Sequence, residues 1–373
     1  MTTMLPSLPT TFGRLTDVFA SALGAVTGTD NRLGFRPAKH ALVILVDGLG
    51  AHNLKGAAGH APFLNGKLNT AKPISCGFPS TTVASITSFA TGLRSGSHGL
   101  IGYQVFDRDQ NLAVNLLTGW GDKVNPIEWQ PNQTVSELAL KAGVKSFVVG
   151  PADYADSGFT RATMRSAKYL AANDVSSRFE KVKEIFRHTE PTLSYLYVPE
   201  LDQAAHAFGA DSEKWLARLE EVDSEVRKLA EKISADCLVV LTADHGIIDV
   251  PSTSHIYLDE LPAIQDQLLN VGGDPRVNFV YLKDAAATET IAKHIAEFVG
   301  DFGYVVTRGQ MLKLGWYGDL SSRAKSLLPE IFVIARKTVA FYHRGFAKPQ
   351  SLKMIGQHGA LSAQELMVPL LVF

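Results

Sequence analysis

Aspartate and histidine residues recur directly behind short apolar runs of this 373-residue sequence. The runs ALVILV, LSYLYV and CLVVLT continue into the polar stretches VDGLG, VPELDQAAH and ADHG, and a further histidine lies in GQHG, shortly before the last apolar run. The residues concerned are Asp47, Asp202, His206, Asp244, His245 and His358. In an open α/β sheet, the carboxyl ends of the strands border the crevice in which ligands bind. We therefore expect these side chains to meet at one edge of a sheet.

The chemistry of these side chains favours a divalent metal ion. Aspartate oxygens and histidine nitrogens suit zinc or a similar ion, with bonds of about 2 Å. Asp202 and His206 are four residues apart, which places both on one face of a helical turn. Asp244 and His245 are adjacent and can converge only on a loop. The set suffices for two sites with three protein ligands each, although any one member could instead be a helix cap or a structural polar residue.

A hydroxyl-rich segment, GFPSTTVASITSFATGLRSGSHG (77–99), offers a candidate nucleophile. Its Pro-Ser pair breaks the chain, and VASITSFA then predicts a helix that ends at Gly92. Thr81 or Thr82 would lie at the start of this helix, where free N–H groups and the helix dipole favour an anion. A hydroxyl beside a divalent ion can lose its proton near neutral pH and attack phosphorus. A helix cap is the alternative role for either threonine.

The elements that must position these groups follow from the hydrophobic pattern. Continuous apolar runs of this length are typical of strands that are buried on both faces of a mostly parallel sheet. The expected strands are 41–46, 146–150, 193–198, 237–242 and 366–373. Residues 213–233 carry apolar side chains at spacings of three and four, which predicts an amphipathic helix. The alternation of strands and helices predicts an α/β protein, a three-layer αβα sandwich with a mostly parallel central sheet.

A second unit is expected within residues 255–345, as a small αβ subdomain inserted into a core of residues 1–254 and 346–373. Its predicted elements are strands at 276–282, 303–307 and 330–335 and a helix around 286–299. We expect this subdomain to shape one wall of the cleft and to select the leaving group.

Composition excludes several classes of protein. Lys+Arg 36 and Asp+Glu 37 give a formal net charge of −1, so no field of one sign attracts nucleic acid or an anionic membrane. The first thirty residues contain no secretory signal pattern, and no apolar run approaches the roughly 20 residues that span a bilayer. Two cysteines, Cys76 and Cys237, cannot build a disulfide framework and fit a reducing compartment. We predict a cytoplasmic protein without membrane insertion.

The motifs VDGLG, FPSTTVASITSFATG, SHG, PELDQAAH, ADHG and GQHG, in this order over residues 41–373, resemble the alkaline phosphatase superfamily. Within it they are most similar to the nucleotide pyrophosphatase/phosphodiesterase family. The resemblance implies an alkaline phosphatase-like fold and a hydrolase that cleaves phosphodiester or pyrophosphate bonds of nucleotide-type substrates. It also implies a threonine nucleophile and a covalent phospho-threonine intermediate. Counting back from Ala90-Thr91-Gly92 places the family's nucleophile on Thr82.

The resemblance further implies two divalent metal ions, with zinc expected and manganese as the alternative. One ion would be held by Asp47, Thr82, Asp244 and His245, and the other by Asp202, His206 and His358. Two positions depart from the family pattern. The asparagine often found three residues after the nucleophile is Ser85, and the lysine often found directly before it is Thr81. Ser85 and Val83 are the predicted substrate-binding residues.

Two alternatives to a phosphodiesterase stay open. A phosphomonoesterase or phosphomutase of the same superfamily would bring extra basic side chains to the phosphate dianion, and Arg94, Arg276 and Arg344 are candidates. A metal-binding or partner-binding protein without catalysis would need neither the nucleophile nor the full set of ligands. The expected partner is a small-molecule phosphodiester or nucleotide. No basic stripe indicates nucleic acid binding, and the oligomeric state is left open.

Overall fold

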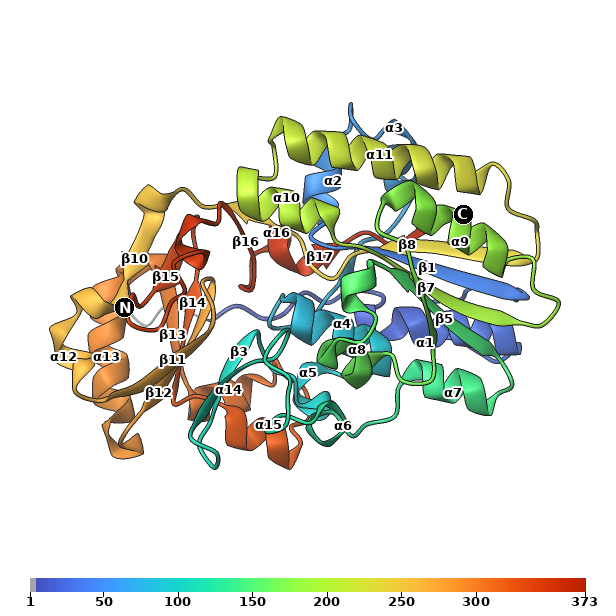
Figure 1. Ribbon diagram of the computed structural model, residues 1–373. Helices are drawn as coiled ribbons and strands as arrows, with labels where there is room; N and C mark the ends of the chain where they lie inside the picture. The colour runs from blue at the N-terminus through green and yellow to red at the C-terminus, as the bar shows by residue number, and fades with distance from the viewer. Residues whose placement is uncertain (1–4) are drawn as a thin grey trace.

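A six-stranded sheet forms the centre of the larger part of the molecule in the computed structural model, which describes residues 5–373 (Figure 1). Its strand order is β18-β8-β1-β7-β5-β6, and all neighbours are parallel except β18, which is antiparallel to β8. Every residue of β1 and β8 is buried, as the continuous apolar runs predicted. The strands are β1 His40–Val46, β5 Lys145–Gly150, β6 Lys168–Ala171, β7 Thr192–Val198, β8 Cys237–Thr242 and β18 Leu371–Val372.

Helices cover both faces of this sheet, which confirms the predicted three-layer αβα sandwich (Figure 1). One layer contains α1 Leu15–Thr27, α4 Thr82–Thr91, α7 Val135–Lys141 and α8 Gly158–Thr163. The other layer contains α2 Ala51–Gly56, α3 Pro62–Leu68, α9 Val175–Ile185, α10 Glu200–Phe208 and α11 Glu213–Ala230. The apolar stripe predicted for 213–233 is buried along α11, and the helix ends three residues earlier than the pattern indicated.

Helix α4 begins and ends where the sequence predicted. Thr81 is its N-cap, in an extended conformation, and its hydroxyl accepts a hydrogen bond from the Ala84 N–H. Gly92 closes the helix with a φ of 70°, a left-handed conformation that glycine adopts without steric cost. The small and β-branched side chains of α4 let it pack closely against α1, and nearly all of them are buried.

A second, four-stranded antiparallel sheet forms the other end of the molecule (Figure 1). Its order is β11-β12-β14-β13, and α13 Thr288–Val299 packs against it. The strands are β11 Leu268–Asp274, β12 Val277–Leu282, β13 Gly303–Thr307 and β14 Ile331–Ala335. Three of these strands and the helix occupy the predicted positions. The sequence reasoning missed β11, which ends in two glycines and an aspartate that are unfavourable for strands.

A hairpin from earlier in the chain also packs against the second sheet. It consists of β3 Gln104–Asp107 and β4 Leu112–Asn115, and β3 lies beside β11. Arg323 donates to Asp107 at 2.8 Å, and Arg108 donates to the Leu282 carbonyl at 2.8 Å. The hairpin thereby ties the segment that follows α4 to the 255–345 unit. The other elements of this end include β10 His255–Tyr257, α12 Pro262–Gln265, α14 Arg308–Leu314, α15 Ser322–Leu327 and β15 Ala340–Tyr342.

The C-terminal run, predicted as one strand over 366–373, is two short strands in different sheets. β17 Met367–Val368 pairs with β2 Ile74–Ser75, and β18 pairs with β8. Pro369 lies between them, and a proline cannot donate the ladder hydrogen bond that would continue the first strand. The remaining short elements are α5 Ser95–His98, α6 Pro126–Trp129, β9 Ile248–Asp249, β16 Gly356–Gln357 and α16 Ala363–Leu366, of which α16 packs against β17.

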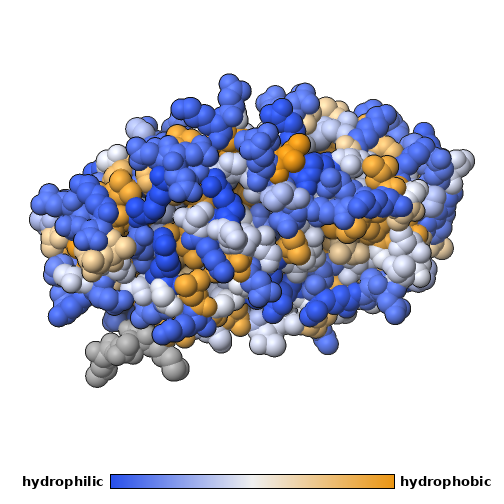
Figure 2. All heavy atoms as spheres, turned by 90° about the horizontal axis from the view of Figure 1, so that it is seen from below, coloured by the Kyte–Doolittle hydropathy of each residue, from blue (hydrophilic) through white to orange (hydrophobic). Residues whose placement is uncertain are grey.

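The surface is mixed in character. Figure 2 shows polar and charged side chains spread over one face, with apolar side chains interspersed among them. Across residues 5–373, no helix is both long enough and apolar enough to cross a membrane.

Candidate active site

The first group of predicted ligands gathers at the ends of β1 and β8. These strands are parallel neighbours in register, so the residues that follow them meet at one edge of the sheet. The His245 Nε2 atom lies 3.4 Å from Asp47 Oδ1 and 3.4 Å from Asp244 Oδ2. All three side chains are buried. The prediction that Asp47, Asp244 and His245 converge therefore holds in the structure.

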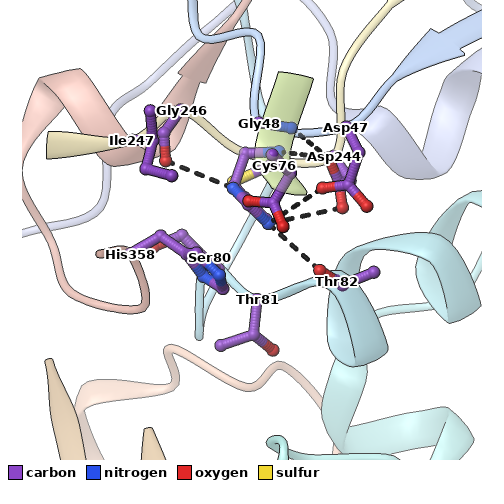
Figure 3. Close-up of polar contacts among 12 residues, drawn as sticks. Asp47, Gly48, Cys76, Ser80, Thr81, Thr82, Asp244, Gly246, Ile247 and His358 are labelled. Carbon is purple, nitrogen blue, oxygen red and sulfur yellow. Dashed lines mark hydrogen bonds and ion pairs between the residues drawn. The ribbon is translucent and has the colours of Figure 1, made fainter. Parts of the chain in front are cut away.

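Thr82 is the hydroxyl residue that faces this group (Figure 3). Its Oγ1 lies 3.1 Å from His245 Nε2, at the first residue of α4. The neighbouring Thr81 uses its hydroxyl as the helix cap, and the Ser80 hydroxyl donates to the Ala360 carbonyl at 2.8 Å. Of the three consecutive hydroxyl residues, Thr82 is thus the one placed to react beside the ligands.

The second group combines α10, which follows β7, with the loop after β16. The His206 Nε2 atom lies 3.1 Å from Asp202 Oδ2, one helical turn away. His358 joins them, with its ring centroid 5.3 Å from that of His206. The His358 ring also stacks on His245 at 3.7 Å, so the two groups adjoin.

Backbone carbonyls fix the orientation of all three histidine rings. The Nδ1 atoms of His206, His245 and His358 lie 2.7 to 3.2 Å from the carbonyl oxygens of Gly356, Gly246 and Ser80, respectively. A carbonyl oxygen can only accept, so each Nδ1 carries the proton. The Nε2 atom of a neutral ring then has a free lone pair, as a metal-ligating histidine requires.

The carboxylates of both groups lack partners for buried oxygens. Among the described residues, none donates a hydrogen bond to Asp47 Oδ1, Asp202 Oδ1 or Asp244 Oδ2. A buried carboxylate without a partner is costly, and a bound cation removes that cost. Within each group the possible ligand atoms lie within 4.8 Å of one another. The residues therefore fit two divalent ions, and oxygen and imidazole ligands are those that zinc and manganese accept.

The electrostatics of the site also favour cation binding. Burial raises the pKa of Asp47, and the neighbouring Asp244 and Asp202 carboxylates raise it further. Burial, with the charge of Asp202, raises the pKa of Asp244 to about 6. Burial lowers the pKa of His245 to about 4 and, together with His245, that of His358 to about 3. Mutually repelling carboxylates beside neutral imidazoles form a strong potential for a cation.

Sequence reasoning missed the residues that hold the first group in place. The Tyr197 hydroxyl donates to Asp47 Oδ2. The Gly48 and His245 N–H groups donate to Asp244 Oδ1 at 3.2 and 3.1 Å. Tyr197 belongs to the apolar run LSYLYV, in which a tyrosine is expected to be a core side chain. No signal in the sequence therefore indicated its hydrogen bond to Asp47.

The sequence indicates Ser80 only as part of the Pro-Ser break before the helix, whereas in the structure Ser80 connects the two parts of the site. Its hydroxyl donates to the Ala360 carbonyl at 2.8 Å and accepts from the Gly359 N–H at 3.2 Å. Its carbonyl accepts from His358, and its N–H donates to the Gly359 carbonyl at 3.3 Å. Ser80 is fully buried and two residues from Thr82. It therefore joins the nucleophile segment to the loop that carries His358.

The two predicted substrate-binding residues lie inside α4. The Val83 side chain is fully buried in the core, so only its backbone N–H, in the first helical turn, can face a ligand. Ser85 is also buried, and its hydroxyl has no hydrogen-bond partner among the described residues. The structure thus places both beside the site without showing a side-chain route to a substrate.

The three candidate phosphate-binding arginines are engaged elsewhere. Arg94 donates to the carbonyls of the 315–316 turn. Arg276 forms a buried, two-pronged ion pair with Glu365 at 2.8 and 3.1 Å. Arg344 pairs with the carboxylates of the 259–260 segment.

A cavity of about 430 Å³ opens beside Thr82. Aromatic side chains dominate its walls, namely Trp120, Tyr154, Phe159, Tyr169, Tyr195 and Tyr197. The cavity therefore offers flat apolar faces, with the Thr82 hydroxyl at one wall and the first ligand group behind it.

The fold and this site together define an alkaline phosphatase-like protein. Residues 41–361 match the family described as type I phosphodiesterase/nucleotide pyrophosphatase, and the chain belongs to that family. This confirms the family predicted from the order of the motifs.

Curated relatives agree with this assignment. An uncharacterised pyrophosphatase/phosphodiesterase of Schizosaccharomyces pombe is 26% identical over 201 residues, which cover 49% of this chain and 39% of that protein. Ectonucleotide pyrophosphatase/phosphodiesterase family member 1 of Homo sapiens is 26% identical over 193 residues, 49% of this chain and 20% of that protein. The chain thus spans less than half the length of these relatives.

Solved structures show the same fold. Murine ectonucleotide pyrophosphatase/phosphodiesterase 5 superposes with a TM-score of 0.70 at 18% identity and covers 88% of this chain and 87% of that chain. An inactive threonine-to-alanine variant of the same murine protein, in complex with AMP, superposes with a TM-score of 0.69 at 17% identity and the same coverage.

Proposed function

We propose that this protein is a phosphodiesterase that cleaves phosphodiester or pyrophosphate bonds of nucleotide-type substrates, with Thr82 as the nucleophile. One observation carries the proposal. The Thr82 hydroxyl lies 3.1 Å from His245, at the start of α4, beside buried carboxylate oxygens that have no hydrogen-bond partner. A hydroxyl in this position can attack a phosphoryl group that the same site holds.

Two divalent ions fit the two groups, with zinc as the expected metal and manganese as the alternative. The first would be held by Asp47, Asp244 and His245 together with Thr82, and the second by Asp202, His206 and His358. Bound there, such ions supply Lewis-acid stabilisation of the charge that develops on the phosphoryl and leaving oxygens.

The residues of the chain supply the nucleophile and its orientation. Thr82 would lose its hydroxyl proton, and its Oγ1 would form a bond to phosphorus while the bond to the leaving oxygen breaks, giving a phospho-threonine ester. The leaving oxygen would take up a proton from water as it departs. Water would then break that ester and restore the Thr82 hydroxyl. The first N–H groups of α4, including that of Val83, have no partner within the helix and favour the negative charge of a phosphoryl oxygen.

The cavity beside Thr82 supports a nucleotide substrate. Its aromatic walls provide faces on which a planar base can stack. The murine ectonucleotide pyrophosphatase/phosphodiesterase 5 variant solved in complex with AMP has the same fold. A nucleoside in this cavity would place its 5′-phosphate next to Thr82.

The basic residues favour a diester over a monoester. Among the described residues that line the cavity at Thr82, none is arginine or lysine. Arg94, Arg276 and Arg344 are occupied by other partners. A phosphate dianion would therefore find no side-chain cation here, whereas the single charge of a diester needs less compensation.

The second sheet and its helices, in the 255–345 unit, would form one wall of the cleft and contact the leaving group. The cytoplasmic location stays a prediction, as does the identity of the metal.

The test compares two chromogenic substrates, the p-nitrophenyl ester of thymidine 5′-monophosphate and p-nitrophenyl phosphate. The protein is stripped with a chelator and reloaded with zinc, manganese or magnesium. We expect the diester to be cleaved faster, and only after reloading. Faster cleavage of the monoester would support the phosphomonoesterase alternative. No turnover of either substrate with any of the metals would support a non-catalytic protein.

A further inference from the structure

Asp274, the last residue of β11, is a buried carboxylate outside both ligand groups. It is 6% exposed, and its Oδ2 has no hydrogen-bond partner among the described residues. Asn278 on β12 is 4% exposed and has an unpartnered Oδ1. The Asn278 amide nitrogen donates to the Asp274 and Phe341 carbonyls at 2.7 and 3.1 Å. These two bonds identify the nitrogen as the donor atom, so the unpartnered atom is the amide oxygen. Two buried oxygen atoms, one from each side chain, thus lack a donor in the described part of the chain.

Both residues line a cavity of about 360 Å³ between the second sheet and the segment that follows β15. Aromatic side chains form much of the remaining wall, namely Tyr103, Phe341, Tyr342 and Phe346. Lys348 lies at the exposed rim and leaves Asp274 Oδ2 unpaired. Within residues 5–373, Asp274 therefore has no ion-pair partner, and several aromatic side chains share the wall of its cavity.

This cavity adjoins the second ligand group. Gly359 follows His358 directly, and a Cβ placed on Gly359 would lie 3.3 Å from the Asp274 Cβ and 3.2 Å from Val277. On the same side, Met354 lines the cavity and precedes Ile355, whose N–H donates to the His206 carbonyl. The cavity therefore lies directly beside the second ligand group.

The two cavities also meet each other. Thr118 lines both this cavity and the aromatic cavity beside Thr82. A phosphodiester held between the ligand groups can therefore place one substituent in each. In an in-line attack the leaving oxygen lies opposite the Thr82 hydroxyl, and the Asp274 cavity, which Thr82 does not line, would take that substituent.

We propose that this second cavity is the leaving-group subsite and that it takes a leaving group with a positively charged amine. The proposal rests on the phosphodiesterase function proposed above. An ammonium group offers the donors that Asp274 and Asn278 lack, and the aromatic faces attract a cation. Burial raises the pKa of Asp274 to about 7, so above that pH its carboxylate would repel a leaving group with a terminal anion.

The test uses two thymidine 5′-phosphodiesters with leaving groups of the same length and shape, 4-aminobutanol and pentanol. The measured quantity is the ratio of their kcat/KM values for the metal-loaded protein. We expect the amine to be preferred by about tenfold, because a cation over aromatic faces and beside a buried carboxylate gains of the order of that factor. The Asp274→Asn variant, which keeps the shape and removes the charge, should bring the ratio close to one.

The matched control is Asp223→Asn. Asp223 is a buried carboxylate on α11 that accepts from the Leu64 N–H, and it lies in neither cavity. This variant should keep the amine preference of the wild type. Loss of the preference in both variants would show a general effect of the substitution and overturn the role of Asp274.

The wild-type chain separates the two proposals before any variant is made. Turnover of the p-nitrophenyl ester with an amine-to-pentanol ratio of one would overturn the subsite and leave the phosphodiesterase function standing. No turnover of any diester would overturn the function itself. A preference for pentanol would overturn the charge assignment.

Discussion

Replacing Ser80 with alanine should weaken metal binding at the second ligand group more than at the first. The substitution removes the hydrogen bonds of the Ser80 hydroxyl to Ala360 at 2.8 Å and Gly359 at 3.2 Å, both in a buried environment. Each lost bond costs about 1 kcal/mol, and more where the partner left behind stays buried and unsatisfied. We expect the loss of both hydrogen bonds to cost a total free energy of about 2–3 kcal/mol.

Part of this loss should fall on metal binding at the second group, because the loop that Ser80 holds carries His358. If the whole free energy were lost from metal binding at this group, the affinity for the second ion would fall by about 30- to 140-fold, at tenfold for each 1.4 kcal/mol. Asp47 and Asp244 accept hydrogen bonds from Tyr197 and Gly48, which lie outside this loop. The first ion should therefore weaken much less than the second, although His245 stacks on His358. Calorimetric titration of the metal-free protein with zinc would resolve the two events.

Thr81→Ala is the matched control, since it removes the adjacent hydroxyl, which only caps α4. It should cost about 1 kcal/mol of stability or less and leave both binding events unchanged. If Ser80→Ala binds two ions with wild-type affinity, Ser80 does not position the His358 loop. Equal weakening of both events would also refute the reasoning, because the damage would then be general.

Three further predictions follow from the site. Thr82→Ala should lower turnover by several orders of magnitude with little loss of the second metal ion, and Thr82→Ser should keep partial activity, as steady-state kinetics and elemental analysis would show. Tyr197→Phe removes the hydrogen bond to Asp47 and should weaken the first ion by about tenfold in the same zinc titration. Burial raises the pKa of Asp244 to about 6, so protons compete with the metal ion for this carboxylate below that pH. Metal occupancy and turnover should therefore fall as the pH drops from about 7 to about 5. Activity that stays flat over this range would contradict the assignment of Asp244 as a ligand.

The sequence predicted the core of the fold and the members of both ligand groups. Strands buried on both faces are continuous apolar runs, so β1, β7 and β8 are visible in the sequence. Because parallel strands end at one edge of a sheet, the polar residues behind them were expected to meet. That inference needs only the strand assignment and no distances.

Other features depend on contacts between distant segments, which the sequence does not encode locally. Ser80 contacts a loop about 280 residues further along the chain, and its hydroxyl looks like any serine before a helix. The hairpin at 104–115 packs against β11, and β11 was not predicted as a strand because its two glycines interrupt the apolar pattern. Asp274 follows those glycines and reads as a turn residue, so its burial beside the second group was not foreseeable.

The central claim is that Thr82 attacks phosphorus and is then released by water. Two such displacements in sequence retain the configuration at phosphorus, whereas direct attack by water inverts it. The most direct measurement is the stereochemical course of hydrolysis of a thymidine phosphorothioate diester of one configuration in heavy-oxygen water. We predict retention for the metal-loaded wild-type protein; inversion would contradict a covalent role for Thr82.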